Sequence, residues 1–427
     1  MTIHVVQTGD NISKIAAQYG VTTEQLIQDN ELKTPESLVI GQTIVVLYPD
    51  RTYTVKQGDT LLSIANQYNT TVIELLQNNP ELSQVKTLAE GQKIVIDYKG
   101  EKLGDIAING YAFPEINQDL LIRTLPYLTY LTIFTYGFTP AGELLPLNDE
   151  EVIRIARDYG VAPLMLISTL TKEGTFSNAL AHSIFVDKEA QNRLIDNIIS
   201  NMKKKNYYGL DIDFEFVYPE DRQAYVDFVK NVTTKLNAEG YQVMVALAPK
   251  IASDQPGLVY EGHDYAGLGA AANAALLMTY EWGYTYGPPM AVSPLNEVKK
   301  VLDYGVTQIP PEKLFMGVPN YAYDWTLPYV KGKSRAKSIG NVEAVELALK
   351  ENIPIKFDET AQTPFYNYTA DDGKEHVVWF EDARSINAKV GLVPQYKLQG
   401  VAYWNLMKYF PQNWLVVNSL FDINKLL

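Results

Sequence analysis

The chain has 427 residues, of which 46% are hydrophobic and 20% charged, which is typical of a globular protein with more than one structural unit. Its net charge of −14 disfavours binding by phosphate neutralisation, so neither nucleic acid nor an anionic membrane is an expected partner. Cys is absent and only four His occur, none at ligand spacing, which excludes disulfides, thiolate nucleophiles and a His-based zinc centre, and we expect no metal and no cofactor.

The N-terminal sequence MTIHVVQTGD has neither the basic start nor the apolar core of a secretion signal. No apolar run in the chain approaches the roughly 20 residues that a membrane-spanning helix needs. We therefore expect a protein that is synthesised without a signal peptide and acts away from membranes. We also expect it to be a monomer.

Two copies of one small unit occupy the first quarter of the chain. VVQTGDNISKIAAQYGVTTEQLIQDN (5–30) matches TVKQGDTLLSIANQYNTTVIELLQNN (54–79) at a period of 49, and IGQTIVV (40–46) matches EGQKIVI (90–96) at a period of 50. Each copy predicts a strand, a Gly-Asp turn, two helices and a closing strand. Asp10 and Asp59 are expected at the N-caps of the first helices.

Both copies resemble LysM modules, which bind N-acetylglucosamine chains of peptidoglycan or chitin. The resemblance implies one module at 1–48 and a second at 51–98, each with a shallow sugar groove. The groove residues that it implies are Gly9, Asp10, Asn11 and Ile12 in the first copy and Gly58, Asp59, Thr60 and Leu61 in the second. The alternative is that these are only turn and cap residues.

After the polar linker KGEKLG (99–104), apolar strands alternate with helical stretches such as NDEEVIRIARDYG and DKEAQNRLIDNIISNMKKK. Eight strands with crossover helices predict a (β/α)8 barrel over 103–427. The expected strands are IAINGYA (106–112), LTIFTYGF (131–138), APLMLIS (162–168), GLDIDFEF (209–216), QVMVALAP (242–249), AALLMTYEW (274–282), LFMGVPNY (314–321) and GVAYWNLM (400–407).

One gap, between strands seven and eight, is too long for a single crossover helix. It contains KSIGNVEAVELALKENIPIKF followed by TPFYNYTADDGKEHVVWFEDARS. We expect a small α+β insertion at about 326–392.

The fourth predicted strand carries three acids at alternate positions, Asp211, Asp213 and Glu215. Residues two apart in a strand point the same way, so these carboxylates face the barrel interior while the apolar residues between them pack under the helices. Like charges in a poorly solvated site cannot all stay ionised, so at least one pKa is raised. A carboxyl group with a raised pKa can act as a general acid near neutral pH, and Glu215 lies nearest the mouth of the barrel.

Three other interpretations of the acids remain open at this point. They could form a structural hydrogen-bonded cluster, although the chain offers no evident set of basic partners. Carboxylates at this spacing also suit a hard divalent cation. Finally, they could be the vestige of an active site in a pure binding protein.

Several motifs resemble those of glycoside hydrolase family 18, and they occur in the family's order. YGLDIDFE is similar to the D-x-x-D-x-D-x-E signature, LLMTYEW to the sixth-strand Met-x-Tyr motif, GVPNYAYDW to the seventh-strand Gly-x-Pro motif and GVAYWNL to the eighth-strand segment that ends in Trp. VVWFEDARSINAKV is similar to the tail of the family's insertion domain. The resemblance extends over residues 103–427.

The resemblance implies a role for each matching residue. Glu215 would protonate the glycosidic oxygen, and Asp213 would orient the acetamide of the substrate, whose carbonyl oxygen attacks the anomeric carbon. Asp211 would tune Asp213 through a shared proton. Tyr280 would bind the acetamide and Trp404 would form the floor of subsite −1, the alternative for both being ordinary core packing. Further expected substrate contacts are Tyr111, Tyr321 and Glu281.

The sequence departs from the family pattern at three points. Tyr208 replaces the first Asp of the signature, LISTL replaces the Ser-x-Gly-Gly stretch of many chitinases on the third strand, and Glu281 replaces an Asp that often follows the sixth-strand Tyr. These changes affect the expectation of chitin as substrate more than the expectation of hydrolysis.

The whole chain resembles the cortex-fragment-lytic N-acetylglucosaminidases of bacterial endospores. This implies a hydrolase of spore cortex peptidoglycan that acts during germination, with retention of anomeric configuration, in the cortex or coat region. The alternatives are a non-catalytic peptidoglycan-binding protein of the spore coat, which would be expected to lack the acid, and a chitinase, which would be expected to carry an export signal.

Overall fold

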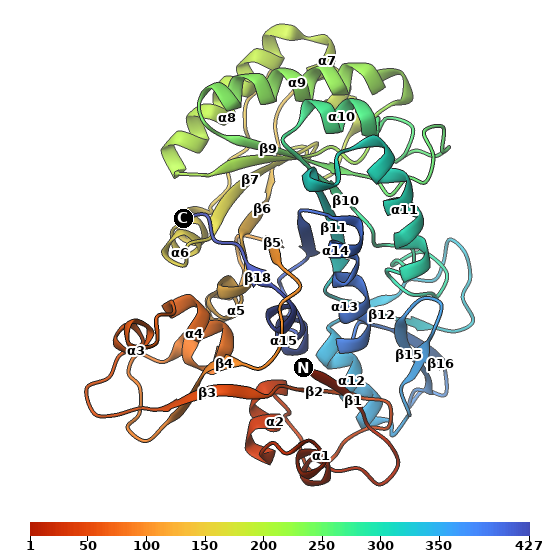
Figure 1. Cartoon of the computed structure of the whole chain (residues 1–427). Coiled ribbons are helices and arrows are strands. Elements are labelled where there is room, and N and C mark those ends of the chain that lie inside the picture. The colour runs from red at the N-terminus through yellow and green to blue at the C-terminus, as the bar shows by residue number, and fades with distance from the viewer.

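Eight parallel strands close into a barrel in the computed structural model, which describes all 427 residues (Figure 1). Neighbours along the sheet follow the chain order from β5 to β11, and β17 then pairs with both β11 and β5 to close the cylinder. The short strand β18 (Asp422–Ile423) lies outside the barrel, parallel to the start of β5. The barrel strands are β5 (Asp105–Ala112), β6 (Tyr130–Tyr136), β7 (Ala162–Ser168), β8 (Gly209–Asp213), β9 (Gln242–Leu247), β10 (Ala274–Leu277), β11 (Leu314–Pro319) and β17 (Gly400–Trp404).

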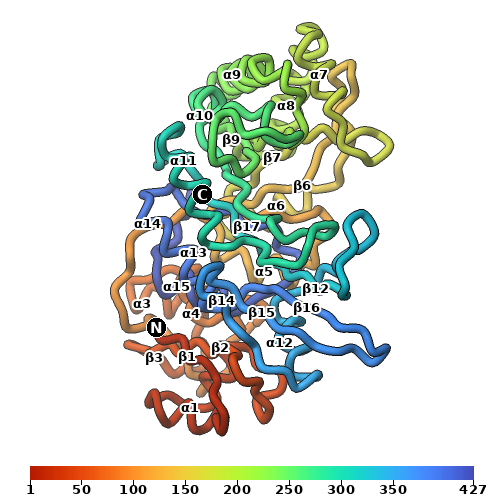
Figure 2. Tube along the Cα trace, turned by 90° about the vertical axis from the view of Figure 1, so that its right-hand side faces the viewer, coloured from red at the N-terminus to blue at the C-terminus, as the bar shows by residue number.

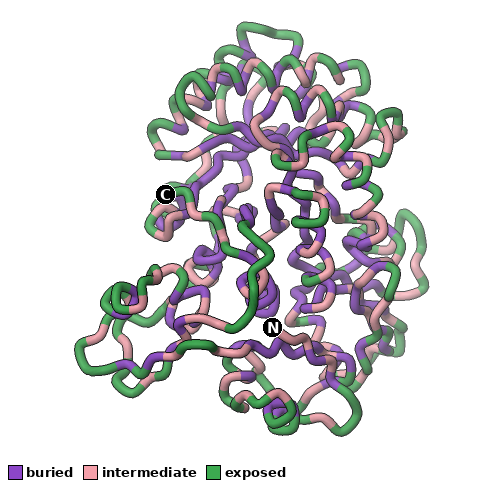
Figure 3. The backbone as a smooth tube through the Cα atoms, in the orientation of Figure 1, coloured by how far each residue is buried: buried purple, intermediate pink, exposed green.

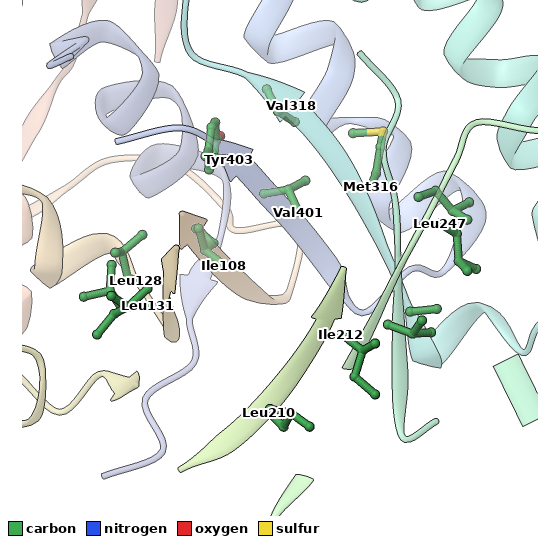
Figure 4. Close-up of a cluster of buried hydrophobic side chains, with 14 of the residues drawn as sticks. Ile108, Leu128, Leu131, Leu210, Ile212, Leu247, Met316, Val318, Val401 and Tyr403 are labelled. Carbon is green, nitrogen blue, oxygen red and sulfur yellow. The ribbon is translucent and has the colours of Figure 1, made fainter. Parts of the chain in front are cut away.

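The two faces of each barrel strand lie in separate apolar layers. Leu210 and Ile212 of β8 point outward and lie in the large cluster between strands and helices, with Ile108, Val401 and Val318 (Figure 4). The inward side chains form a smaller cluster on the barrel axis, made of Ala107, Tyr111, Leu164, Leu166, Met244, Ala246, Leu276, Phe315 and Ala402. The alternation of side chains along a strand produces this division.

Helices cover the outside of the barrel. The helical stretch 187–205 forms α8, where Asp187 accepts hydrogen bonds from the backbone N–H groups of Glu189 and Ala190 and three Lys residues lie in the last turn, which favours both helix ends. None of the helices combines the length and apolar surface that a membrane crossing requires. The covering helices are α5 (Gln118–Thr124), α6 (Glu150–Asp158), α7 (Asn178–Val186), α8 (Lys188–Lys205), α9 (Arg222–Ala238), α10 (Tyr265–Ala271), α11 (Leu295–Gln308), α13 (Ala383–Val390), α14 (Leu392–Tyr396) and α15 (Pro411–Leu420).

The insertion between β11 and β17 is a five-stranded antiparallel sheet with one helix, as the sequence predicts in kind. Its order is β13-β12-β16-β15-β14, and it packs on α12 (Asn341–Lys350) around its own small core. The sheet begins at Ala322, before the expected 326, and its last strand ends at Trp379. Helix α13, inside the expected range 326–392, packs instead in the core around the barrel. The strands are β12 (Ala322–Thr326), β13 (Lys337–Ile339), β14 (Lys356–Asp358), β15 (Thr363–Thr369) and β16 (Glu375–Trp379).

The two N-terminal repeats fold as βααβ units, which confirms the predicted fold class. An Asn at the end of each second helix bonds to that helix and to the closing strand. It is Asn30, the last residue of α2, in the first repeat and Asn79, just after α4, in the second. The elements are β1 (Thr2–Val5), α1 (Ile12–Tyr19), α2 (Thr23–Asn30) and β2 (Thr43–Val46), then β3 (Pro49–Thr54), α3 (Leu61–Tyr68), α4 (Val72–Asn78) and β4 (Lys93–Tyr98).

The first repeat packs against the barrel through α15 (Figure 1). The second repeat packs mostly on α5 and residues 125–127, where Gln77 bonds to Pro126 and Tyr127, and it also contacts α15. Every residue from Pro411 to Asn418 is buried, as expected for a helix with neighbours all round (Figure 3). Gln412 bonds to Thr43 and Asn30 of the first repeat, and Asn418 to Asn78 of the second. Figure 2 shows the repeats beneath the barrel, beside the insertion.

Candidate active site

The three acids of β8 occupy the barrel interior and its mouth. Asp211 is fully buried and Asp213 is 8% exposed, both within the strand. The strand ends at Asp213 rather than at the expected 216, so Glu215 lies two residues beyond it, on the exposed loop at the mouth. The outward Ile212 and Phe214 belong to the core around the barrel, as the alternation predicts.

Asp211 is held by a tyrosine rather than by its neighbouring acid. The Tyr111 hydroxyl donates to Asp211 Oδ2 at 2.5 Å. The Oδ1 atoms of Asp211 and Asp213 are both buried without a hydrogen-bond partner. The predicted proton sharing between Asp211 and Asp213 is therefore not present as a hydrogen bond in this structure, and a side-chain rotation would be needed to form it.

Burial and mutual repulsion raise the pKa values of all three acids. Burial raises the pKa of Asp211 to about 6, against the opposing effect of the Tyr111 hydrogen bond. Burial and then the charges of Glu215 and Asp211 raise the pKa of Asp213. For Glu215, enclosure by the walls of the mouth raises the pKa, and the charge of Glu281 raises it further. The site therefore favours protonated carboxyl groups at higher pH than free Asp or Glu does.

Tyr280 follows β10, two strands along the barrel from β8, and its hydroxyl lies close enough to the acids to be affected by their charges. The charges of Asp213, Glu215 and Glu281 add to burial in raising the pKa of its hydroxyl, so that it stays protonated and can donate. Its ring packs on Gly317, where an added Cβ would lie 2.6 Å from Tyr280 Cε1. The glycine of the Gly-x-Pro motif thus leaves room for the tyrosine of the Met-x-Tyr motif.

Glu281 lies at the rim in the left-handed conformation, with φ of 66°. Its Oε1 atom accepts hydrogen bonds from the hydroxyls of Tyr321 and Tyr323, the latter at 3.1 Å. Both tyrosines are buried, so the two donors fix the carboxylate in place. Tyr323 was not among the residues predicted from sequence, although its position two residues after Tyr321 on the same strand face is a signal that could have identified it.

Trp404 ends β17 and forms an aromatic floor with three other rings. Its ring contacts Tyr111, Phe113 and Phe134 edge-on, with centroids 5.8, 6.1 and 5.0 Å away. A pocket of about 350 Å³ extends from this floor to Glu281, lined also by Tyr321, Tyr323, Asn320, Ser338, Asn405, Met407 and Lys408. A pocket of this size suits a sugar ring, but Asp211, Asp213, Glu215 and Tyr280 are not among its lining residues. Phe113 and Phe134 were missed in the sequence because aromatic residues near strand ends are common in ordinary cores.

A larger cavity, of about 720 Å³, lies away from the acids between the second repeat, the linker and the C-terminus. Its walls carry charges of both signs, including Arg51, Glu74 and Lys102, and none of the site residues. We assign it to the space between packed units.

The Gly-Asp turns of the two repeats are built alike. Asp10 Oδ2 accepts from Gln7 N at 2.7 Å and Asp59 Oδ2 from Lys56 N at 2.8 Å. Neither Asp is a helix N-cap, contrary to the expectation: Asn11 and Thr60, one residue later, cap the helices. The Asp side chains instead close the turns, because their oxygens reach the backbone N–H three residues earlier.

The other groove residues differ in exposure. Gly9, Asn11, Gly58 and Thr60 are exposed and Leu61 is half-buried, whereas Ile12 is 7% exposed and packs in the core of the first repeat. The predicted place of Ile12 in the sugar groove stays a prediction, and little of its surface is exposed. Leu62, 61% exposed on α3, is an apolar residue beside the second turn that the prediction did not include.

Comparisons with known proteins point in one direction. Residues 111–408 match the family model of the glycosyl hydrolases family 18, and residues 4–47 and 53–97 match the LysM domain. The chain is 40% identical over 433 residues to the cortical fragment-lytic enzyme of Bacillus subtilis (strain 168), covering 100% of this chain and 99% of that protein.

Solved structures agree with the sequence comparisons. The spore cortex-lytic enzyme SleL of Bacillus megaterium QM B1551 matches with a TM-score of 0.85 and 37% identity over 100% of this chain and 99% of its own. A chitinase from Chromobacterium violaceum ATCC 12472 matches with a TM-score of 0.69 and 25% identity, covering 74% of this chain and 98% of its own.

Proposed function

The chain belongs to family 18 of the glycosyl hydrolases, and on that premise we propose that it hydrolyses spore cortex peptidoglycan during germination, cleaving after N-acetylglucosamine. The observation that carries the proposal is the pair Asp213, buried in β8, and Glu215, exposed at the mouth of the barrel. Both have raised pKa values, and their charges raise the pKa of Tyr280 as well. The likeness to a cortical fragment-lytic enzyme over the whole chain supports the substrate class.

Glu215 acts as the general acid. Its raised pKa keeps the carboxyl group protonated in a range where free Glu is ionised, and its place on the exposed loop gives it access to a glycosidic oxygen. As the C–O bond breaks, the proton passes from Glu215 to the leaving sugar. The resulting carboxylate then takes a proton from the water that completes hydrolysis.

The nucleophile belongs to the substrate. The acetamide carbonyl oxygen attacks the anomeric carbon, and water later opens the ring from the other face, so the configuration is retained. Asp213 orients the acetamide and balances the positive charge that develops on it. The Oδ1 atom of Asp213 is buried without a hydrogen-bond partner, so the side chain would rotate to bring an oxygen to the acetamide N–H.

This chemistry selects the bond that is cut. The muramic-δ-lactam of spore cortex carries its nitrogen in a ring and has no acetyl group, so it cannot supply the attacking oxygen. N-acetylglucosamine must therefore occupy subsite −1. Tyr280 donates to its acetamide, Trp404 lies beneath its ring, and Tyr111, Tyr321 and Glu281 shape the surrounding wall.

The LysM modules, 1–48 and 51–98, hold the barrel on the insoluble polymer. The proposed contacts are Gly9, Asp10, Asn11 and Ile12 in the first module and Gly58, Asp59, Thr60 and Leu61 in the second. Hydrogen bonds from α15 join both modules to the barrel that carries the cleft. The protein would accordingly be located in the cortex or coat region of the spore.

Mass spectrometry of cortex digests tests the proposal. The wild-type protein is expected to release products that end in reducing N-acetylglucosamine, with retained configuration at the first-formed anomeric centre. Glu215→Gln should release none, whereas Glu101→Gln, at an exposed acid of the linker, should behave as the wild type. Inverted products, or no release by the wild type from cortex or chitin oligomers, would contradict the proposal, and the second outcome would favour a non-catalytic binding protein.

A further inference from the structure

A buried histidine lies directly behind the loop that carries Glu215. His263 is fully buried, in the segment that leads from β9 into α10. Its Nδ1 atom accepts a hydrogen bond from the backbone N–H of Ala248 at 3.0 Å. The proton of the neutral ring must therefore be on Nε2, which lies 3.0 Å from the carbonyl oxygen of Phe214 and donates to it.

The carbonyl of Phe214 belongs to the peptide unit that joins Phe214 to Glu215. A donor fixed on this oxygen sets the plane of that peptide, and the plane sets the direction in which the Glu215 side chain leaves the backbone. The same residue separates Glu215 from Asp213. The histidine thus contacts the backbone at the residue that determines the spacing of Asp213 and Glu215.

Two further contacts hold the same loop. The Phe214 ring stacks on Tyr225 and Phe228, with centroids 5.8 and 5.5 Å away and interplanar angles of 8° and 16°. Gly262 packs on the backbone of Val217, where an added Cβ would lie 2.5 Å from the carbonyl oxygen. The loop is therefore fixed by a ring, a hydrogen bond and a close backbone contact, all from outside the cleft.

The histidine is itself held rigidly. Lys250, fully buried, donates from Nζ to the carbonyl oxygens of His263 and Ser253 at 2.9 and 3.0 Å. The Tyr265 hydroxyl donates to Ala248 O at 2.5 Å and accepts from Lys250 N at 2.9 Å. These hydrogen bonds connect the segments before and after the loop 251–262 and so fix the position of the imidazole ring.

We propose that His263 is a positioning residue for hydrolysis: its Nε2–H, through the Phe214 carbonyl, sets the placement of the Glu215 carboxyl group relative to Asp213. The inference rests on the proposed role of Glu215 as general acid. Burial and the nearby Lys250 ammonium lower the pKa of His263 to about 4, so the ring stays a neutral, single donor over the range in which the enzyme works.

Two isosteric substitutions separate this role from simple packing. In His263→Gln, the side-chain amide nitrogen reaches the position of Nε2 and can donate to Phe214 O. In His263→Asn, the amide oxygen takes the place of Nδ1 and accepts from Ala248 N, but no donor reaches Phe214 O. The variants thus each keep one of the two bonds. His376→Asn, in the insertion, is a control for loss of a partly buried, hydrogen-bonded imidazole elsewhere.

Steady-state kinetics and pH profiles on soluble cortex fragments provide the test. His263→Asn should lower kcat by about 10- to 100-fold with little change in KM, because a misplaced acid affects the chemical step more than binding. The basic limb of the pH profile of His263→Asn should also move to lower pH, because a displaced Glu215 is better solvated and its pKa is then lower. His263→Gln should have a kcat and a basic limb of the pH profile close to those of the wild type. His376→Asn should leave both unchanged.

The results can overturn the inference without touching the proposed function. Equal losses of kcat in His263→Asn and His263→Gln, or an unchanged kcat and pH profile in folded His263→Asn, would sink it while Glu215→Gln remained inactive. Should His263→Asn not fold, Gly262→Ala gives a second test, because its Cβ displaces Val217 and hence the same loop. A folded Gly262→Ala with the kcat and pH limb of the wild type would equally overturn it.

Discussion

The Tyr111 hydroxyl is the single hydrogen-bond donor to Asp211 in the barrel interior, at 2.5 Å from Oδ2, while Oδ1 has none. A carboxylate in this position is removed from solvent and accepts only one hydrogen bond, from Tyr111. Burial consequently raises the pKa of Asp211 to about 6, above the ordinary value of 3.8. The folded state therefore binds a proton that the unfolded state has released between these pH values.

Asp211→Asn should for this reason stabilise the protein at high pH only. Protonated Asp211 makes its full contribution to the free energy of unfolding below pH 4. That contribution is lost as the pH rises through about 6, and for this pKa shift the loss is at most about 3 kcal/mol. The neutral amide avoids the loss and can still accept from Tyr111. Urea unfolding should show a gain of about 1 to 3 kcal/mol at pH 8 and none at pH 4. A destabilised variant at pH 8 would mean that the ionised form is favoured in the fold.

Glu281→Gln should move the pH profile of hydrolysis. Enclosure raises the pKa of Glu215 and the charge of Glu281 adds to it, so neutralising Glu281 lowers that pKa. Because the acid must be protonated, the basic limb of kcat/KM should shift to lower pH, by about 1 unit. Tyr323→Phe is the matched control: it removes the 3.1 Å hydrogen bond but leaves the charge, and it should not lower the limb.

Gly317→Ala should impair catalysis through Tyr280. The added methyl group would lie 2.6 Å from Tyr280 Cε1 and 2.9 Å from the Leu277 carbonyl oxygen, so the ring must leave its place against the acids. We expect kcat on soluble fragments to fall by about tenfold or more. Gly340→Ala controls for the glycine itself, because the nearest atom there, 3.2 Å away, belongs to the flexible side chain of Lys408. Similar kinetics in both variants would contradict the role of Tyr280.

Gln412→Ala should destabilise the modules and the barrel together. Gln412 donates to Thr43 O at 2.6 Å and to Asn30 Oδ1 at 3.0 Å and accepts from Thr43 Oγ1 at 2.7 Å, all buried. Removing it leaves these groups unpaired, at about 1 to 3 kcal/mol in the free energy of unfolding. We expect one cooperative thermal transition at a lower temperature.

Lys33→Ala, also at this interface, supplies the contrast. Lys33 pairs with Glu346 of the insertion, but both side chains are exposed, so its removal should cost at most about 1 kcal/mol. Two separate transitions in the wild type would show instead that the modules unfold independently of the barrel.

The barrel was predictable because each strand is a dense apolar run and most are followed by a helix with a polar face, although α15, after β17, is buried almost throughout. All eight strands form, yet several end earlier than the sequence predicts: β8 stops at Asp213 and β10 at Leu277. The residues that follow, such as Tyr280 and Trp282, keep a strand-like composition. They leave the ladder, Tyr280 to lie near the acids and Trp282 to pack against the core around the barrel, and a pattern of apolar residues cannot distinguish these environments from a strand.

Other features of the site depend on contacts between segments far apart in the chain. The motifs identify Asp213, Glu215 and Tyr280, but the bond from Tyr111 to Asp211 joins residues 100 positions apart. His263 shows no sign of its contact with Phe214 in its own neighbourhood of the sequence. Likewise, the N-caps at Asn11 and Thr60 follow from the backbone of the turns, which the sequence alone placed one residue too early.

The burial of α15 also bears on how such chains can be recombined. A LysM module taken from another protein would lack the partners of α15, which are Thr43 and Asn30 for Gln412 and Asn78 for Asn418. Polar groups at the interface would then be buried without hydrogen bonds. A truncated barrel would present the same helix face to water. Exchange of modules in this architecture thus requires complementary changes on α15, so the carbohydrate-binding and cleaving parts are constrained to diverge together.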